Sequence, residues 1–468
     1  MQALLAIATL CLIELVCAER ILGAYIFQRH GDRTAKGLPP TKLTDLGYHQ
    51  EYLTGAFFHE RYVSASSQHQ IDGISSSVVD LAQVTASAPQ DTVIQISGQA
   101  FLQGLYPPIG RTANETLRNG TVIHSPLGGY QLIPISNVES GTGSEDKTWL
   151  QSASACKNAL LSSNEYYSSD SYEQLSSTTG SLYQSLESYL NQTISSKKLN
   201  FKDAYTIWDL LNVASIHNAT SNLPSDQVMH ELSALANIHE FNLAYNSSEP
   251  IRAVAGLSLA GQVLTALNQT IVSGGKTKLS VQFGAYSTFL SYFGLAGLAK
   301  DARFTGIPVY ASSMVWELVT NATGPEMPSD SEINVRFMFH NGTSIEGSTQ
   351  LEAHPLFEQS ALEIPWTEFV ASTQRFAITS QEQWCQACGN TDGVCSSSIS
   401  TSASSNFPTS SGGMTPPVAG VIGAMVTLGV LGGATMLIIL LCDLRLVRKS
   451  ALARDPEITI KVAGEKGI

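Results

Sequence analysis

Two arginines flank a histidine in the segment Arg29-His30-Gly31-Asp32-Arg33, and residues of these types at this spacing can bind and transfer a phosphoryl group. A neutral imidazole can attack phosphorus and form a phosphohistidine, which splits one difficult displacement into two easier ones. Guanidinium groups offer forked donors that match phosphate oxygens, so the arginines would hold the charge that builds during transfer. The alternative is a surface turn that carries basic residues.

The residues around this segment have the pattern of an opening strand and helix of an α/β domain. The run Ile21–Phe27 is apolar and rich in strand formers, as expected for a buried parallel strand. A polar loop follows, and then helical periodicity over Leu43–Tyr62, with Thr44 or Asp45 able to cap the helix. Chemistry in such sheets lies at the C-terminal ends of strands. The order therefore predicts an α/β sheet with His30 at a strand end.

The middle of the chain, about residues 145–245, is rich in Ser, Tyr, Leu and Asn and has few β-branched clusters. This composition predicts a mostly helical insertion that caps the sheet domain. The helices predicted within it are Ser181–Leu190, Phe201–Val213 and Asp226–Ala244. Beyond the insertion, the pattern favours a helix over Ile251–Leu267 and strands over Lys278–Phe283 and Glu332–His340.

The segment from Arg29 to Ala35 resembles the RHGxRxP signature of the histidine acid phosphatases, a branch of the phosphoglycerate mutase-like superfamily that includes fungal phytases. Ala35 stands where that pattern has proline. Further landmarks follow in the family's order: Thr44-x-x-Gly47, Phe101-Leu102-x-Gly104-Leu105-Tyr106-Pro107, Arg252-Ala253-x-Ala255-Gly256, Tyr310-Ala311-Ser312-Ser313 with Glu317-Leu318, and Trp384-Cys385-x-x-Cys388. The resemblance implies a three-layer α/β domain, with helices on both faces of the sheet and a helical cap. It also implies phosphomonoester hydrolysis with His30 as nucleophile and Arg29 and Arg33 as phosphate ligands, without metal or cofactor.

Two places depart from the family's pattern. The family has a further phosphate-binding arginine upstream of the landmark that ends at Pro107, and Ser87 stands at that position here. The family also has a His-Asp pair after a late strand, in which the Asp gives a proton to the leaving alcohol. Tyr286 and Ser287 occupy that place, and the sequence contains no His, Asp or Glu from 281 to 300.

These departures predict a domain that binds phosphate or a phosphomonoester but in which the family's hydrolytic reaction is impaired. General acid help is typically worth about 10²–10⁴ in rate, and an oxyanion donor contributes a comparable factor. The alternatives are an active acid phosphatase with an unidentified proton donor and a surface glycoprotein with a vestigial pocket. His239-Glu240 is a substitute pair, but it lies inside a helical pattern, where a structural role is the ordinary interpretation.

Charge and composition limit the partners of the chain. The 468 residues carry a formal net charge of −13, and no cluster of Lys and Arg precedes residue 445. Nucleic acid is therefore not expected as a partner, because phosphate backbones demand clustered basic residues.

Two apolar stretches predict a single-pass type I membrane protein. Residues 1–18 form a signal peptide, because Leu4–Val16 is too short to span a bilayer and small residues follow it. The alternative is a buried N-terminal strand. Val418–Cys442 is 25 residues long without a charge, and basic residues follow it, which places the tail (443–468) in the cytosol. A core helix and a lipid-anchor signal are the alternatives for this stretch.

The region between the two apolar stretches has the features of a secreted domain. It comprises an ectodomain over 19–395 and a Ser/Thr/Pro-rich stalk over 396–417. Its glycosylation sequons are at Asn114, Asn119, Asn191, Asn218, Asn246, Asn268, Asn321 and Asn341. Its four cysteines, Cys156, Cys385, Cys388 and Cys395, predict two disulfides of undetermined pairing, although one CxxC also allows zinc or redox chemistry. The cell surface and the vacuolar membrane are the expected locations.

Overall fold

The computed structural model describes residues 19–137, 156–220, 222–343 and 350–396. These residues fall in one compact unit of the chain. Outside the described residues lie the predicted signal peptide, the membrane span, the tail, the first part of the cap and all of the stalk except Ser396.

A mixed eight-stranded sheet forms the centre of the described part, in the order β10-β8-β7-β1-β6-β2-β5, with β9 paired to β8. Its strands are β1 (Arg20–Arg29), β2 (Val84–Ala88), β5 (Ile135–Asn137), β6 (Leu279–Gly284), β7 (Ser313–Thr320), β8 (Ile333–His340), β9 (Glu352–His354) and β10 (Glu363–Pro365). Strands β1, β6, β2 and β5 are parallel, and β7 pairs antiparallel with both β1 and β8. A small hairpin pairs β3 (Glu115–Thr116) with β4 (Val122–Ile123).

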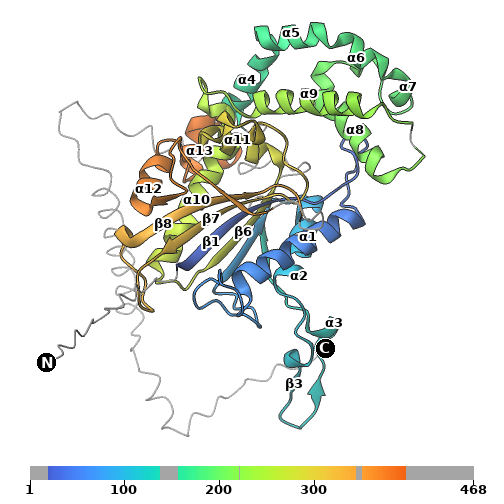
Figure 1. Ribbon diagram of the computed structural model, residues 1–468. Helices are drawn as coiled ribbons and strands as arrows, with labels where there is room; N and C mark the ends of the chain where they lie inside the picture. Colours follow the sequence, from blue (N-terminus) through green and yellow to red (C-terminus); the bar gives the residue numbers. More distant parts are fainter. Residues whose placement is uncertain (1–18, 138–155, 221, 344–349, 397–468) are drawn as a thin grey trace, which may run out of the picture. The chain divides into compact units, whose positions relative to one another are not determined.

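Helices cover both faces of the sheet. Those outside the cap are α1 (Asp45–Phe58), α2 (Thr92–Leu105), α3 (Pro126–Gly129), α10 (Val254–Val272), α11 (Tyr286–Leu295), α12 (Trp366–Gln374) and α13 (Gln381–Cys388). Ala24 and Ile26 of β1 share one core with residues of α1 and α2, whereas Tyr25 and Phe27 share the other with α10, α11 and α12. Because side chains alternate along a strand and both faces of β1 pack against helices, the strand is apolar from Ile21 to Phe27. The mixed α/β fold and its layers agree with the sequence prediction, and Figure 1 shows α1 and α2 together on one face.

The cap is helical and has its own core. It contains α4 (Lys157–Glu165), α5 (Asp170–Thr178), α6 (Gly180–Ser185), α7 (Glu187–Leu190), α8 (Ala204–His217) and α9 (Asp226–Ala244), which cluster together in Figure 1. Tyr183, Phe201 and Leu232 are fully buried within that cluster. The bounds of α9 are those that the sequence predicts, and Ser225 caps it by accepting a hydrogen bond from the backbone of Val228.

One described helix, Pro250–Val272, is long and apolar enough to cross a membrane by length and composition. Its most apolar window is 72% buried in the fold. Leu259, Val263 and Leu267 belong to the core beneath the sheet, so α10 is a core helix of this domain.

Two disulfides join the four cysteines of residues 19–395, as the sequence predicts. Cys156 pairs with Cys388, and Cys385 pairs with Cys395. The CxxC cysteines are therefore not bonded to each other, and both are engaged in structural bridges. All four sulfurs are buried, and the first bridge connects the start of the cap to α13.

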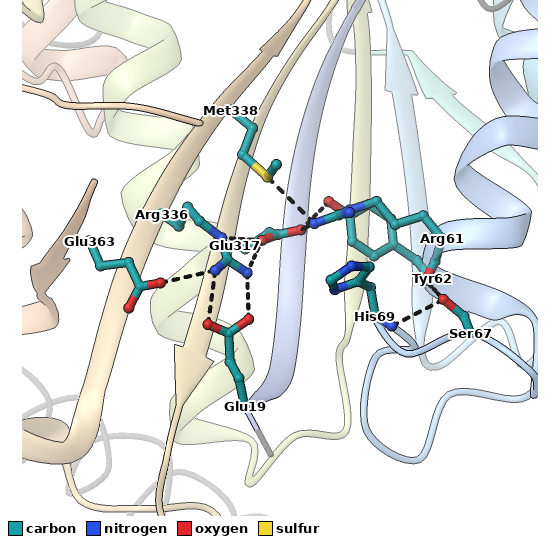
Figure 2. A network of polar contacts seen from close by, with 9 residues as sticks. All are labelled: Glu19, Arg61, Tyr62, Ser67, His69, Glu317, Arg336, Met338 and Glu363. Atoms are coloured by element: carbon teal, nitrogen blue, oxygen red, sulfur yellow. Dashed lines mark hydrogen bonds and ion pairs between the residues drawn. The ribbon is translucent and has the colours of Figure 1, made fainter. Parts of the chain in front are cut away.

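A buried ion network supports the face of β7 and β8 (Figure 2). Glu317 on β7 is fully buried and accepts hydrogen bonds from Arg61 at 2.8 Å, from Tyr62 at 2.6 Å and from Arg336 at 2.8 Å. Arg336 also pairs with Glu19 at 2.7 Å and with Glu363 at 2.9 Å. The hydrogen bond from Arg336 lowers the pKa of Glu19, so this carboxylate stays ionised where the described chain begins.

Candidate active site

The parallel strands bring the predicted residues to one edge of the sheet. His30 follows β1, its backbone nitrogen donates to Gly284 at the end of β6 (3.2 Å), and its carbonyl accepts from Ala311 (3.1 Å). Ser87 lies at the end of β2, opposite Gln282 of β6. Tyr286 begins helix α11 directly after β6. The C-terminal ends of β1, β6 and β2 therefore hold the histidine, the tyrosine and Ser87 at the same edge.

Close packing of α1 onto the loop fixes the backbone after His30. A Cβ at Gly31 would lie 2.3 Å from the carbonyl oxygen of Gly47, and one at Gly47 would lie 2.0 Å from that of Asp32. Only glycine fits at both positions. Thr44 caps α1 by accepting from Gly47 at 3.0 Å, which decides between the two caps that the sequence allowed.

The imidazole of His30 is held in the tautomer that a nucleophile requires. Its Nδ1 lies 2.8 Å from the carbonyl oxygen of Gly31. A carbonyl oxygen only accepts hydrogen bonds, so in the neutral ring Nδ1 carries the proton and Nε2 carries the lone pair. The side chain is fully buried, and its ring lies 5.7 Å from that of Tyr310.

Arg33 forms a buried ion pair with the cap. Its Nη1 lies 3.2 Å from both carboxylate oxygens of Asp209 on α8, and both side chains are fully buried. Its Nη2 donates to the hydroxyl of Tyr205 at 2.7 Å. Asp209 also accepts from the backbone nitrogen of Lys36 at 2.7 Å. The guanidinium that would hold a phosphate is therefore already matched by a carboxylate of the same chain.

Arg29 lies among aromatic rings next to His30. Its guanidinium carbon is 4.5 Å from the ring centre of Tyr310 and 5.3 Å from that of Tyr286. It also donates to the carbonyl of Pro308. These cation–π contacts hold the charge over the rings. Burial raises the pKa of the Tyr310 hydroxyl, which therefore remains a neutral phenol.

A carboxylate from the cap reaches the place where the resemblance puts the His-Asp pair. The hydroxyl of Tyr286 donates to Oε2 of Glu240 at 2.7 Å, and Nδ1 of His239 lies 2.8 Å from Oε1 of the same carboxylate. The helical pattern around His239-Glu240 is real, because both lie on α9. The helix nevertheless presents Glu240 to Tyr286, and no residue of 281–300 could have indicated this.

The histidine phosphatase superfamily (branch 2) matches residues 36–340, about two thirds of the sequence. The chain belongs to this superfamily. Its segment Arg29–Arg33 precedes the matched residues, so the structure is what relates that segment to the fold. No curated protein matches the sequence.

Solved structures of the histidine phosphatase fold include phytases that superpose on most of this superfamily member. The apo phytase of Hafnia alvei has a TM-score of 0.52 at 14% identity, covering 79% of this chain and 98% of its own. The phytase of Citrobacter braakii has a TM-score of 0.52 at 14% identity, covering 79% of this chain and 99% of its own. The phytase of Klebsiella sp. ASR1 has a TM-score of 0.51 at 12% identity, covering 77% of this chain and 96% of its own. At these identities the likeness shows the fold.

Within this histidine phosphatase fold, the predicted arginines and histidine lie in the interior. Arg29 is 3% exposed, and His30 and Arg33 are 0% exposed, which does not fit a surface turn. Sequence reasoning missed Asp209 and Tyr205 as the partners of Arg33. The one signal in the sequence is that Asp209 stands between apolar residues of a predicted helix. A carboxylate that is buried there is almost always paired with another group, so this position could have indicated an ion pair.

Proposed function

We propose that this superfamily member binds phosphate or a phosphomonoester at His30 and hydrolyses the ester poorly. The observation that carries the proposal is the buried Arg33–Asp209 pair beside Tyr286 and Ser287, which stand in place of the family's His-Asp pair. An incoming dianion has to compete with Asp209 for the Arg33 guanidinium. Ser87 offers a neutral hydroxyl in place of a third arginine, so the transition state receives less charge stabilisation.

The test is phosphate release from an aryl phosphate near pH 5, using the full-length glycosylated protein. With the acid and one arginine missing, the expected rate is about 10⁴-fold below that of a complete site, because both contributions act on the same step. The control is His30→Ala, which removes the nucleophile and leaves the aromatic surroundings. If the wild type releases phosphate rapidly and His30→Ala abolishes this release, the proposal of an impaired enzyme is refuted.

The contact between Glu240 and Tyr286 favours a second candidate, an active phosphatase that draws its proton from this pair. Here the Tyr286 hydroxyl would turn its single hydrogen from Glu240 to the leaving oxygen, and Glu240 in its acid form would return a proton to the phenolate. Tyr286→Phe and Glu240→Gln separate the two candidates. In an active enzyme both variants lower kcat by about 10²-fold or more, whereas in an impaired one neither changes the background.

We further propose that the domain is the lumenal part of a type I membrane protein, anchored by residues 418–442. All eight sequon asparagines in the described part are exposed or half-buried, which leaves room for glycans. The buried disulfides suit an oxidising compartment. Treatment of sealed microsomes with protease should remove the tail and spare a glycosylated fragment. Cleavage of the domain itself in sealed vesicles would contradict this topology.

A further inference from the structure

A cavity of about 730 Å³ lies next to the candidate active site, between the loop that follows Arg33 and helices α7 and α8 of the cap. Thr34 and Ala35 line one side of it. Leu210 and Leu211 line the other side and directly follow Asp209, the partner of Arg33. Its volume is within the range of small-molecule pockets.

The walls of this cavity are mostly apolar. Leu38, Pro39 and Pro40 contribute from the loop, and Leu38 is 55% exposed although it faces a hydrophobic surface. On the cap side, Leu190 and Leu211 are buried in the cap's core, whereas Val213, Ala214 and Leu223 are half-buried and keep apolar surface in water. An alkyl chain laid between the two walls would remove apolar surface from water on both sides.

Basic groups lie at one part of the wall. Lys42 is exposed, and its ammonium makes no ion pair with any residue in the described ranges. His217 is one-third exposed, and its Nε2 lies 2.5 Å from Oδ1 of Asp32. The other oxygen of Asp32, Oδ2, is buried with no hydrogen-bond partner among the described residues. Because Asp32 offsets any charge on His217, Lys42 is the cation available to an anionic head group.

We propose that this cavity binds a single-chain anionic amphiphile, with the alkyl chain between Leu38 and the half-buried Val213 and Ala214 of α8 and the head group on Lys42. Among the described lining residues, Lys42 and His217 are the basic ones, too few for a polyphosphate. A carboxylate and a phosphate monoester both suit one ammonium, so the shared chemistry is an anion on an alkyl chain. This binding does not require turnover at His30.

The test is photolabelling of the full-length protein in nanodiscs with a diazirine-bearing dodecanoic acid, followed by peptide mapping. The label is expected within residues 34–44 or on α8. The double variant Leu38→Ser/Lys42→Glu should lower that labelling about fivefold or more, since it removes part of the apolar wall and reverses the anchoring charge. The matched control is Leu81→Ser/Lys276→Glu, because Leu81 is 51% exposed and neither residue lines the cavity. Labelling spread over the surface, or equal in both double variants, overturns the proposal.

Unlabelled competitors define the ligand. Dodecanoic acid and dodecyl phosphate distinguish the two sources of the anion, and dodecanol, which lacks the charge, should compete less well than both. Hexanoic acid should compete much more weakly, because each buried methylene tightens binding about fourfold. Equal competition by hexanoic and dodecanoic acid contradicts burial of the chain.

Asn218, a sequon residue, also lines the cavity. Labelling that appears only in Asn218→Gln would show that a glycan fills the cavity, which overturns the proposal for the glycosylated protein.

Discussion

Asp209 and a bound phosphate would compete for one guanidinium, and this competition makes a testable prediction at the scale of single residues. In Asp209→Asn, the buried Arg33 loses its counter-charge, which should destabilise the free protein by about 3–5 kcal/mol. Inorganic phosphate can then supply the missing charge. We therefore expect phosphate to raise the Tm of Asp209→Asn much more than that of the wild type. Asp226→Asn, at an exposed helix start, is the control. Equal phosphate-induced shifts in all three proteins would mean that phosphate does not reach Arg33.

Glu51 gives a second prediction at the scale of single residues, because its side chain is fully buried. It accepts from Gln28 at 3.0 Å, and burial raises its pKa well above the ordinary value of 4.5. The folded state thus keeps a proton that the unfolded chain releases. Stability is then fully present below about pH 4.5 and falls as the pH rises towards the folded pKa, by about 1.4 kcal/mol per pH unit.

Glu51→Gln removes this dependence, since an amide holds its hydrogens at every pH. The variant should match the wild type below about pH 4.5 and become increasingly more stable above it. Thermal unfolding between about pH 4 and pH 8 measures the difference, with the exposed Glu60→Gln as reference. A constant offset between Glu51→Gln and the wild type across this range would show that the proton does not matter.

At the scale of elements, the network of Figure 2 predicts which carboxylate holds β7 and β8 together. Glu317→Gln leaves Arg61 and Arg336 without their shared, fully buried partner, and should cost about 3–5 kcal/mol. Glu363→Gln removes a partner of Arg336 that is one-third exposed, and should cost about 1 kcal/mol or less. Denaturant unfolding of both variants gives the comparison. Similar losses of unfolding free energy in the two variants would mean that the burial of Glu317 does not strengthen its ion pairs.

Local pattern explains how much of the fold and of the site the sequence could predict. Helix α9 was predictable because Ser225 caps it, and β1 because an apolar run leads into a polar turn. Strand β7 was not assigned from the sequence, and a glutamate at its centre argues against a strand unless Arg61 and Arg336 are known to lie opposite. Likewise, His30 and Arg33 were identified from neighbouring residues, whereas Asp209 lies 176 residues further along the chain. Contacts between residues so far apart in the chain depend on how the cap packs on the sheet domain. The spacing of residues in the sequence does not indicate this packing.

For the whole molecule, the two disulfides constrain the chain over very different lengths. Cys156–Cys388 closes a separation of 232 residues, whereas Cys385–Cys395 closes 10. A cross-link restricts the unfolded chain more when its loop is longer, so the chain-entropy argument ranks the first bridge as the stronger. It also ties the start of the cap to helix α13, where Asn158 donates to the carbonyl of Ala387 at 2.9 Å.

Replacing Cys156 and Cys388 by serine should therefore lower the free energy of unfolding by about 5 kcal/mol, against about 2–3 kcal/mol for the Cys385/Cys395 pair. Urea unfolding of the two double variants measures both losses. Loosening of the cap should also weaken the Arg33–Asp209 pair, because α4 contacts α9, and α9 packs against α8. The long-range variant should then bind phosphate more tightly than the short-range one, since Arg33 is released from its carboxylate. Unchanged phosphate affinity together with the larger loss of stability would show that the cap holds Arg33 without help from the bridge.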